Sequence, residues 1–235
     1  FHSMPDLFHD SSLIPASLEA WFETRGWMIP PHQVAMVEAD RDGRSALLVA
    51  PTGTGKTMAG FLPSLIELSA PDAEDSLHTI YISPLKALAV DIERNLAIPI
   101  REMGLDIRAE TRTGDTPQAK RKRQRENPPQ VLMTTPESLE MLLTWPDAAT
   151  IFKGVRRVVL DELHALAGNK RGELLSLSLS RLHRLAPGMR VVGLSATVAN
   201  PVALRGWLNP DVEQVAVIRA SAGIEPCHLY TSAAA

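Results

Sequence analysis

The sequence predicts an α/β protein whose mainly parallel β-sheet is flanked by helices on both faces. Six short apolar runs are spaced along the chain, each followed by a loop and a helical pattern. Most of these runs are too continuous to be half-exposed antiparallel strands, whereas buried parallel strands have this pattern. Strands that alternate with helices imply a doubly wound sheet, in which ligands bind outside the carboxyl ends of the strands. The predicted strands span residues 46–50, 79–83, 130–134, 157–160, 191–194 and 215–218.

Two helical segments precede the first predicted strand. Residues 18–25 have the apolar spacing of a short amphipathic helix, and Gly26 ends it. Two prolines at positions 30–31 can open the next helix, which carries Gln33. A turn at residues 42–43 then leads into the sheet.

The composition excludes several classes of protein. With 235 residues, 45% of them hydrophobic and 22% charged, the chain is not disordered, collagen-like or a coiled coil. A net charge of −3 excludes a uniformly basic protein that coats nucleic acid, although a local basic patch stays open. The single cysteine, Cys227, allows no intrachain disulfide. We therefore expect a reducing compartment.

Neither a membrane span nor a secretory signal is expected. No apolar stretch approaches the roughly 18 residues that a membrane span needs. The first residues lack the basic and apolar regions of a secretory signal. These observations predict a cytoplasmic protein that does not bind a membrane.

A glycine-rich loop, with the sequence PTGTGKT, follows the first predicted strand and precedes a helical pattern over residues 58–68. Glycines in such a loop let backbone N–H groups approach phosphate oxygens, and the helix N-terminus adds a positive dipole end. We expect Lys56 to reach the β and γ phosphates and Thr57 to ligate Mg²⁺. The strict pattern begins with glycine where this chain has Ala50, so a fortuitous glycine-rich turn is the alternative. The expected nucleotide contacts in this loop are Thr52, Gly53, Thr54, Gly55, Lys56 and Thr57.

Two adjacent carboxylates, Asp161 and Glu162, follow the predicted strand at 157–160. We expect this strand end to place Asp161 beside the phosphate loop of a neighbouring strand, where an aspartate holds Mg²⁺. Glu162 can then orient and deprotonate the attacking water. Adjacent carboxylates in a crevice are costly unless a cation offsets them, which favours a metal site. A helix cap is the alternative role for this pair.

Together these motifs resemble those of superfamily 2 helicases of the DExH type. The matches keep the family's order and run from Gly26 to Thr197, which is most of the chain. The matching segments are 26–33 (Q motif), 50–57 (motif I), 83–89 (Ia), 111–116 (the Thr-Gly-Asp segment), 134–139 (Ib), 161–164 (II) and 195–197 (III).

The flanks of these motifs resemble the large helicase-related (Lhr) family, closest to its bacterial branch of ligase-associated DExH-box helicases. The flanks that carry this resemblance are residues 86–91, 161–166, 170–172 and 193–198. The resemblance implies an ATP- and Mg²⁺-dependent helicase that moves 3′ to 5′ on DNA and acts in DNA repair. It further implies a bacterial, nucleoid-associated location, with single-stranded or 3′-tailed duplex DNA as partner. Repair proteins such as an ATP-dependent ligase are further candidate partners.

The resemblance also assigns roles around the nucleotide. Gln33 would recognise the adenine edge, with Trp27 shaping the base pocket, although the segment is about one residue shorter than the DEAD-box form. His164 would link the catalytic carboxylates to Ser195 and Thr197, which would sense the nucleotide state. The alternatives are a surface glutamine, a core tryptophan, a hydrogen-bonded core histidine and a polar helix cap.

The remaining motifs lie at other strand ends and would contact the nucleic-acid backbone with little sequence specificity. Thr135 and Pro136 also suit a helix cap and first helical residue, so capping alone explains that motif. The basic residues 120–125 lie in a helical stretch that begins at 116–117. They favour a solvated face, with DNA contact as the alternative. The expected nucleic-acid contacts are Ser83, Pro84, Lys86, Thr113, Gly114, Asp115, Thr135, Pro136 and Glu137.

The resemblance implies a motor with two RecA-like domains that hold ATP between them. Motifs IV to VI of the second domain do not follow Thr197, so we expect the first motor domain alone, nearly inactive by itself. Another P-loop enzyme, such as a nucleotide kinase, and a binding module with a vestigial nucleotide site are the alternatives. The expected segments are a tag remnant (1–4), a helical lead-in (5–40), a RecA-like domain (41–220) and the start of a linker (221–235).

Overall fold

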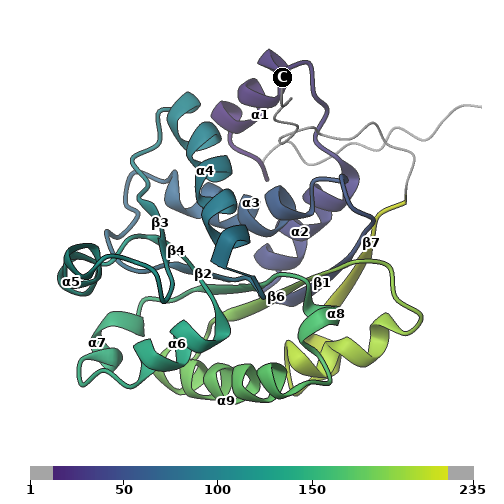
Figure 1. Cartoon of the computed structure of the whole chain (residues 1–235). Helices are drawn as coiled ribbons and strands as arrows, with labels where there is room; N and C mark the ends of the chain where they lie inside the picture. Colours follow the sequence, from purple (N-terminus) through teal and green to yellow (C-terminus); the bar gives the residue numbers. More distant parts are fainter. Residues whose placement is uncertain (1–12, 222–235) are drawn as a thin grey trace, which may run out of the picture.

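A seven-stranded sheet forms the centre of the computed structural model, which describes residues 13–221 (Figure 1). The strands are β1 (Ser45–Val49), β2 (Thr79–Ile82), β3 (Ala109–Arg112), β4 (Val131–Thr134), β5 (Arg157–Leu160), β6 (Arg190–Ser195) and β7 (Val215–Arg219). Their order across the sheet is β3-β4-β2-β5-β6-β1-β7, and every pair is parallel. All strands therefore end at one edge, the carboxyl edge, and begin at the opposite amino edge.

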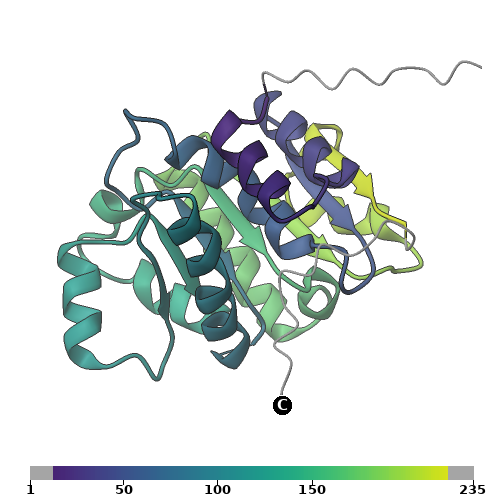
Figure 2. The same ribbon diagram turned by 90° about the horizontal axis from the view of Figure 1, so that it is seen from above.

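Helices cover both faces of the sheet, as predicted. In Figure 1, α1 to α4 lie above the sheet and α6, α7 and α9 lie below it. Seen from above, the N-terminal helices lie beside the β7 end of the sheet (Figure 2). The helices are α1 (Ala16–Thr24), α2 (Pro31–Arg41), α3 (Lys56–Leu68), α4 (Lys86–Glu102), α5 (Gln118–Glu126), α6 (Pro136–Leu143), α7 (Ala148–Phe152), α8 (Leu163–Leu166) and α9 (Lys170–Leu185), with 3₁₀ turns η1 (Pro201–Trp207) and η2 (Val212–Gln214).

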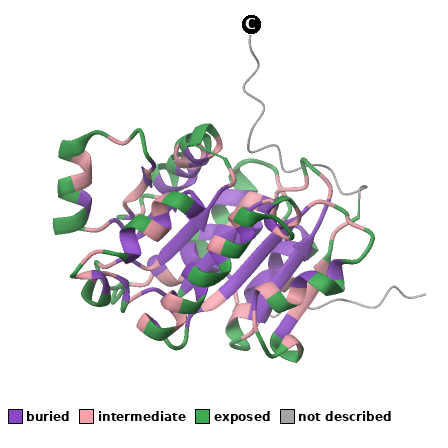
Figure 3. Cartoon of the chain, turned by 60° about the horizontal axis from the view of Figure 1, so that its bottom comes forward, coloured by how far each residue is buried: buried purple, intermediate pink, exposed green. Residues whose placement is uncertain are grey.

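The sheet divides the core into two layers because successive strand side chains point to opposite faces. Within β5, Val159 packs under α3 while Val158 faces the α9 side. The strands are buried and the outer helix surfaces are exposed (Figure 3). Gly60 lets α3 lie close to the sheet, since a Cβ there would be 3.1 Å from side-chain atoms of Leu194 and Val159. This contact fixes the helix that follows the phosphate loop.

The six predicted strands are confirmed to within about one residue, but β3 was missed. Its sequence, Ala-Glu-Thr-Arg, lacks an apolar run because it lies at the exposed edge of the sheet. The helix predicted from residue 58 begins earlier, at Lys56, since Gly55 caps it in the left-handed region. Gly26, with φ of 67°, follows the end of α1 as expected.

Some predictions concern residues beyond the described range. The proposed tag remnant, the start of the lead-in and almost all of the linker lie outside residues 13–221, as does Cys227. Within residues 13–221, no helix has both the length and the hydropathy that crossing a membrane requires.

Candidate nucleotide site and nucleic-acid interface

The phosphate loop joins β1 to α3 at the carboxyl edge. Gly53 and Gly55 both adopt the left-handed conformation, with φ of 79° and 80°, which glycine adopts at little steric cost. The Thr54 hydroxyl donates to the Pro51 carbonyl at 2.8 Å and closes the turn. Thr52 is exposed, and Thr57 is half-buried in the first turn of α3. The loop therefore presents a helix N-terminus to any anion held there.

Lys56 is the unsatisfied group of this loop. The residue is only 9% exposed, and its Nζ atom has no hydrogen-bond partner within residues 13–221. A buried ammonium without an acceptor is costly, so such a site is completed by an anion. Phosphate oxygens match this need, and the residues present therefore fit a nucleotide phosphate group.

Gln33 connects α2 to the phosphate loop. Its side chain is fully buried, and Nε2 donates to the Gly55 carbonyl at 3.3 Å. Its Oε1 atom is buried without a partner in the described chain, which leaves one acceptor for a ligand. The surface-glutamine alternative is therefore wrong. Trp27 packs edge-to-face on Trp21, with ring centroids 5.8 Å apart, as the core alternative predicted.

Asp161 lies at the end of β5, but the expectation that β5 neighbours the phosphate-loop strand is wrong. β6 lies between β1 and β5. The Lys56 charge nevertheless reaches Asp161 and favours its ionised form. Burial, followed by the Glu162 charge, outweighs this effect and raises the pKa of Asp161 to about 6. A cation bound between these carboxylates would relieve both costs.

Glu162 has the only left-handed backbone conformation outside glycine in the described chain, with φ of 49° and ψ of 43°. Such a conformation costs about 1–2 kcal/mol for a side chain of this kind. Its N–H donates to Asp161 Oδ1 at 3.0 Å. The strained residue thus lies directly after the strand end that carries Asp161.

His164 joins the carboxylates to the end of β6. Its Nδ1 atom lies 3.2 Å from both the Ser195 hydroxyl and the Ala196 N–H, and Nε2 lies 3.2 Å from Glu162 Oε2. Because Ala196 N–H donates to Nδ1, the ring proton belongs on Nε2 and faces the carboxylate. Thr197, expected in the same group, is exposed, and within the described chain it makes no hydrogen bond to His164 or Ser195.

Tyr81 on β2 is a residue that the sequence reasoning missed. It is fully buried and stacks on Phe61 with ring centroids 4.7 Å apart. Burial, and then the charge of Asp161, raises the pKa of Tyr81 well above its usual value. A tyrosine between two isoleucines of a buried strand was the available signal.

The segment at 113–115 meets the start of α4. Lys86 Nζ lies 3.0 Å from Asp115 Oδ1, and both side chains are exposed. A Cβ on Gly114 would lie 3.3 Å from that ammonium, so glycine permits the close approach. Thr113 accepts a hydrogen bond from the Asp115 N–H at 3.3 Å. The structure thus brings motif Ia and the Thr-Gly-Asp segment together.

Two further segments, at Pro84 and Glu137, meet through Arg171, a residue of the family-like flank 170–172. Arg171 donates from Nε to Glu137 Oε1 at 2.6 Å and from Nη2 to the Pro84 carbonyl at 2.7 Å. Thr135 caps α6 by accepting from the Ser138 N–H, and Pro136 is the first residue of the helix. The capping alternative for this motif is therefore confirmed.

Beside motif Ia, the Ser83 hydroxyl accepts from the Leu85 N–H at 2.7 Å. This contact shapes the turn between β2 and α4. The basic residues 120–125 lie on α5, and their cations, which are exposed or half-buried, are engaged within the chain. The partners are Glu93 for Lys120, backbone carbonyls for Arg121, Glu126 for Lys122, Glu110 for Arg123 and Asp147 for Arg125.

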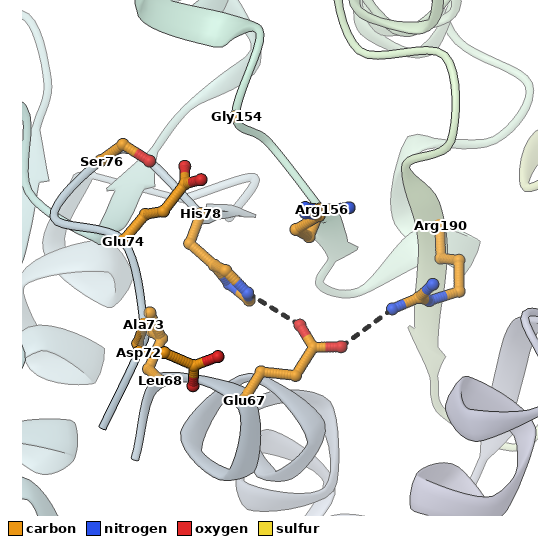
Figure 4. A pocket seen from close by; sticks show the side chains of 10 residues that line it. All are labelled: Glu67, Leu68, Asp72, Ala73, Glu74, Ser76, His78, Gly154, Arg156 and Arg190. Atoms are coloured by element: carbon orange, nitrogen blue, oxygen red, sulfur yellow. Dashed lines mark hydrogen bonds and ion pairs between the residues drawn. The ribbon is translucent and has the colours of Figure 1, made fainter. Parts of the chain in front are cut away.

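A cavity of about 470 Å³ lies away from this site, at the amino edge (Figure 4). Its lining includes Glu67, which pairs with both His78 and Arg190, and the exposed Arg156. None of the predicted site residues lines it.

Known proteins resemble this chain along most of its length. The family model for the DEAD/DEAH box helicase matches residues 30–204. "ATP-dependent helicase Lhr-Core" of Methanocaldococcus jannaschii is 40% identical over 200 residues, which cover 79% of this chain and 24% of that protein. "Lhr helicase/uracil glycosylase" of Escherichia coli is 42% identical over 185 residues, which cover 71% of this chain and 12% of that protein.

Solved structures give the same result. The structure of Mycobacterium smegmatis helicase Lhr bound to ssDNA and AMP-PNP is similar with a TM-score of 0.83 and 38% identity. The match covers 89% of this chain and 28% of that one. The chain therefore spans 28% or less of the length of each of these three relatives.

Proposed function

Because this chain belongs to the DEAD/DEAH box helicase family, we propose that residues 41–220 form the first motor domain of an ATP-dependent DNA helicase or translocase. The observation that carries the proposal is the buried Lys56 ammonium, which has no partner in the described chain and lies near Asp161. A charge arrangement of this kind is completed by a nucleotide phosphate and a cation together.

The proposed nucleotide contacts follow from the unsatisfied groups. Lys56 and the backbone N–H groups of the loop would bind the β and γ phosphates of ATP. Gln33 Oε1 is an acceptor that an adenine amino group would satisfy. Thr57 and Asp161 would hold Mg²⁺, which neutralises charge on the phosphates when bound. These residues would therefore bind and orient ATP and would form no covalent bond with it.

Glu162 is the proposed general base. Its carboxylate would orient the attacking water and accept its proton, since no other carboxylate shares this strand end with Asp161 within the described chain. The His164 Nε2–H holds the same carboxylate at 3.2 Å, while Nδ1 faces Ser195. A movement of the Glu162 side chain on hydrolysis would thus be transmitted through His164 to the loop after β6. Thr197 in that loop is a further proposed sensor of the nucleotide state.

The loops at 83–86, 113–115 and 135–137 are the proposed contacts to DNA. Hydroxyl groups, backbone N–H groups and the α6 N-terminus suit phosphate oxygens and carry no base information. We propose single-stranded or 3′-tailed duplex DNA as the partner, with 3′-to-5′ movement and a role in DNA repair. A cytoplasmic, nucleoid-associated location and an ATP-dependent ligase partner complete the proposal, on family resemblance alone.

A second RecA-like domain would complete the site. An arginine finger from such a domain is worth about 10³–10⁵ in turnover in related enzymes, so this chain alone is expected to hydrolyse ATP slowly or not at all. Robust DNA-stimulated hydrolysis by residues 1–235 alone would contradict that expectation.

The deciding experiment is the ATPase rate of the whole protein, with and without single-stranded DNA. A rate that DNA stimulates supports the motor. Phosphoryl transfer to a small acceptor would support a nucleotide kinase instead. ATP binding without turnover, even with DNA, would leave a binding module with a vestigial site.

A further inference from the structure

We propose that Arg171 is a positioning residue that holds two proposed DNA-binding loops, at Pro84 and Glu137, in one fixed geometry. The inference rests on the proposed function of those loops. Arg171 lies in the first turn of α9, outside both loops, and its guanidinium reaches each of them. Among residues 13–221, no other side chain is hydrogen-bonded to both loops.

The contacts form a fork that only a guanidinium can make. Arg171 Nε lies 2.6 Å from Glu137 Oε1, and Nη2 lies 3.2 Å from Glu137 Oε2. The same Nη2 donates to the Pro84 carbonyl at 2.7 Å. Both carboxylate oxygens of Glu137 are thus engaged by arginine. A lysine ammonium keeps the charge but cannot reproduce this planar geometry.

The base of Arg171 is itself held rigidly to the segment after the catalytic carboxylates. Asn169 caps α9 by accepting from the Gly172 N–H at 3.0 Å, and its Nδ2 donates to the Ala165 carbonyl at 2.7 Å. A Cβ on Gly172 would lie 2.1 Å from the Leu166 carbonyl oxygen, so only glycine permits this packing. Arg171 therefore connects α8, which directly follows Glu162, to both DNA loops.

The chain supplies a matched control in Arg181, on the same helix. Arg181 donates to Glu140 Oε1 at 2.8 Å and to the Leu143 carbonyl at 2.9 Å. Like Arg171, it thus binds one carboxylate and one backbone carbonyl, but both of its acceptors lie on α6. Its side chain is 42% exposed, against 41% for Arg171. Only Arg171 reaches the loop at Pro84.

The test measures binding of a fluorescent oligothymidylate to the whole protein carrying Arg171→Ala, Arg171→Lys or Arg181→Ala. We expect Arg171→Ala to weaken binding about tenfold, in the range for residues that tune a site without touching its ligand. Arg171→Lys should be equally weak, while Arg181→Ala should bind as wild type. ATP affinity should be the same in all four proteins. Hydrogen exchange at the Leu85 and Ser138 amides should accelerate in Arg171→Ala and Arg171→Lys and stay unchanged in Arg181→Ala.

Unchanged DNA affinity in Arg171→Ala would overturn the inference and leave the proposed function standing. Full rescue by Arg171→Lys, with a salt slope smaller by about 0.7–0.9 in Arg171→Ala, would instead identify a direct phosphate contact and also overturn it. A wild-type protein that binds no oligothymidylate would contradict the proposed function, and the inference would fail with it. Equal losses in Arg171→Ala and Arg181→Ala would show a general packing effect and refute positioning.

Discussion

The two edges of the sheet differ in whether their buried charged side chains have partners. At the carboxyl edge, the Lys56 ammonium is buried without a partner in the described chain. At the amino edge, Arg157 is completely buried and every guanidinium nitrogen is bound. Its Nε lies 3.1 Å from Asp40 Oδ1, Nη1 lies 2.7 Å from the Ser64 hydroxyl, and Nη2 reaches Asp40 and, at 3.3 Å, Glu67.

The carboxyl groups at the two edges shift in opposite directions. Burial raises the pKa of Glu67, but the hydrogen bond from His78 and the charges of Arg157 and Arg190 outweigh it and hold the pKa at about 2. Figure 4 shows His78 and Arg190 converging on Glu67. Burial instead dominates at Asp161, whose pKa is about 6.

The difference in charge pairing indicates that the amino edge stabilises the fold and that the carboxyl edge binds ligand. The amino-edge network joins the beginnings of β2, β5 and β6 to the ends of α2 and α3, so it stabilises the elements whose other ends carry the motifs. The carboxyl edge keeps unpaired charge that a ligand can complete. A buried charge without a partner lowers the stability of the ligand-free protein but favours binding of a ligand of opposite charge.

Arg157→Ala should give the largest effect. The substitution removes the ion pairs of Arg157 with Asp40 and Glu67 and leaves these carboxylates with less compensating positive charge. The free energy of unfolding should therefore fall by about 3–5 kcal/mol. Urea denaturation of the chain measures this. Arg156→Ala, at the exposed residue that precedes Arg157, is the control and should change stability by less than about 0.5 kcal/mol. Equal effects of the two substitutions would refute the distinction between the edges.

Glu162→Gln should come next. It removes the proposed base and should slow ATP hydrolysis by the whole protein at least about 10²-fold, while Mg-ATP binding persists. Single-turnover hydrolysis and fluorescent-ATP binding measure the two effects separately. Hydrolysis at the wild-type rate would exclude Glu162 as the base.

Lys56→Ala should lower the affinity for ATP without lowering the stability of the fold. ATP affinity should fall at least about tenfold, because charged hydrogen bonds to the phosphates are lost. The free energy of unfolding should stay level or rise, since a buried ammonium without a partner in the described chain is removed. Fluorescent-ATP titration and urea denaturation check the pair, with exposed Lys153→Ala as control. Unaltered ATP affinity would count against the phosphate-loop assignment.

The smallest effect is a difference in pH dependence of the metal-free chain. The folded-state pKa of Glu67 lies below its usual 4.5, so its stabilisation is present above pH 4.5 and lost as pH falls toward about 2. The folded-state pKa of Asp161 lies above its usual 3.8, so its contribution is lost as pH rises from about 4 through about 6. Thermal melts measured against pH should show a melting temperature that changes less below pH 4.5 in Glu67→Gln. In Asp161→Asn it should change less between about pH 4 and about pH 6. Identical profiles for both variants would contradict the opposite shifts.

Local features of the site were predictable from the sequence because neighbours along the chain determine them. The phosphate loop needs only glycines at 53 and 55 in the left-handed region and a following helix. The cap at Thr135 needs only a hydroxyl ahead of a proline. The parallel α/β fold also followed, since buried runs alternating with helices admit few other solutions. The expected RecA-like fold is confirmed.

Only the tertiary structure determined which distant groups meet. Local periodicity does not encode strand order, so the insertion of β6 between β1 and β5 was not foreseen. The contacts of His164 with Glu162 and Ser195 become visible only once those strands are placed. The forks of Arg171 and Arg157 join residues 34 to 117 positions apart. The sequence by itself determined the loops that carry the chemistry, because their geometry is local. The tertiary structure decided which charges are paired and which are left for a ligand, because pairing depends on contacts between distant segments.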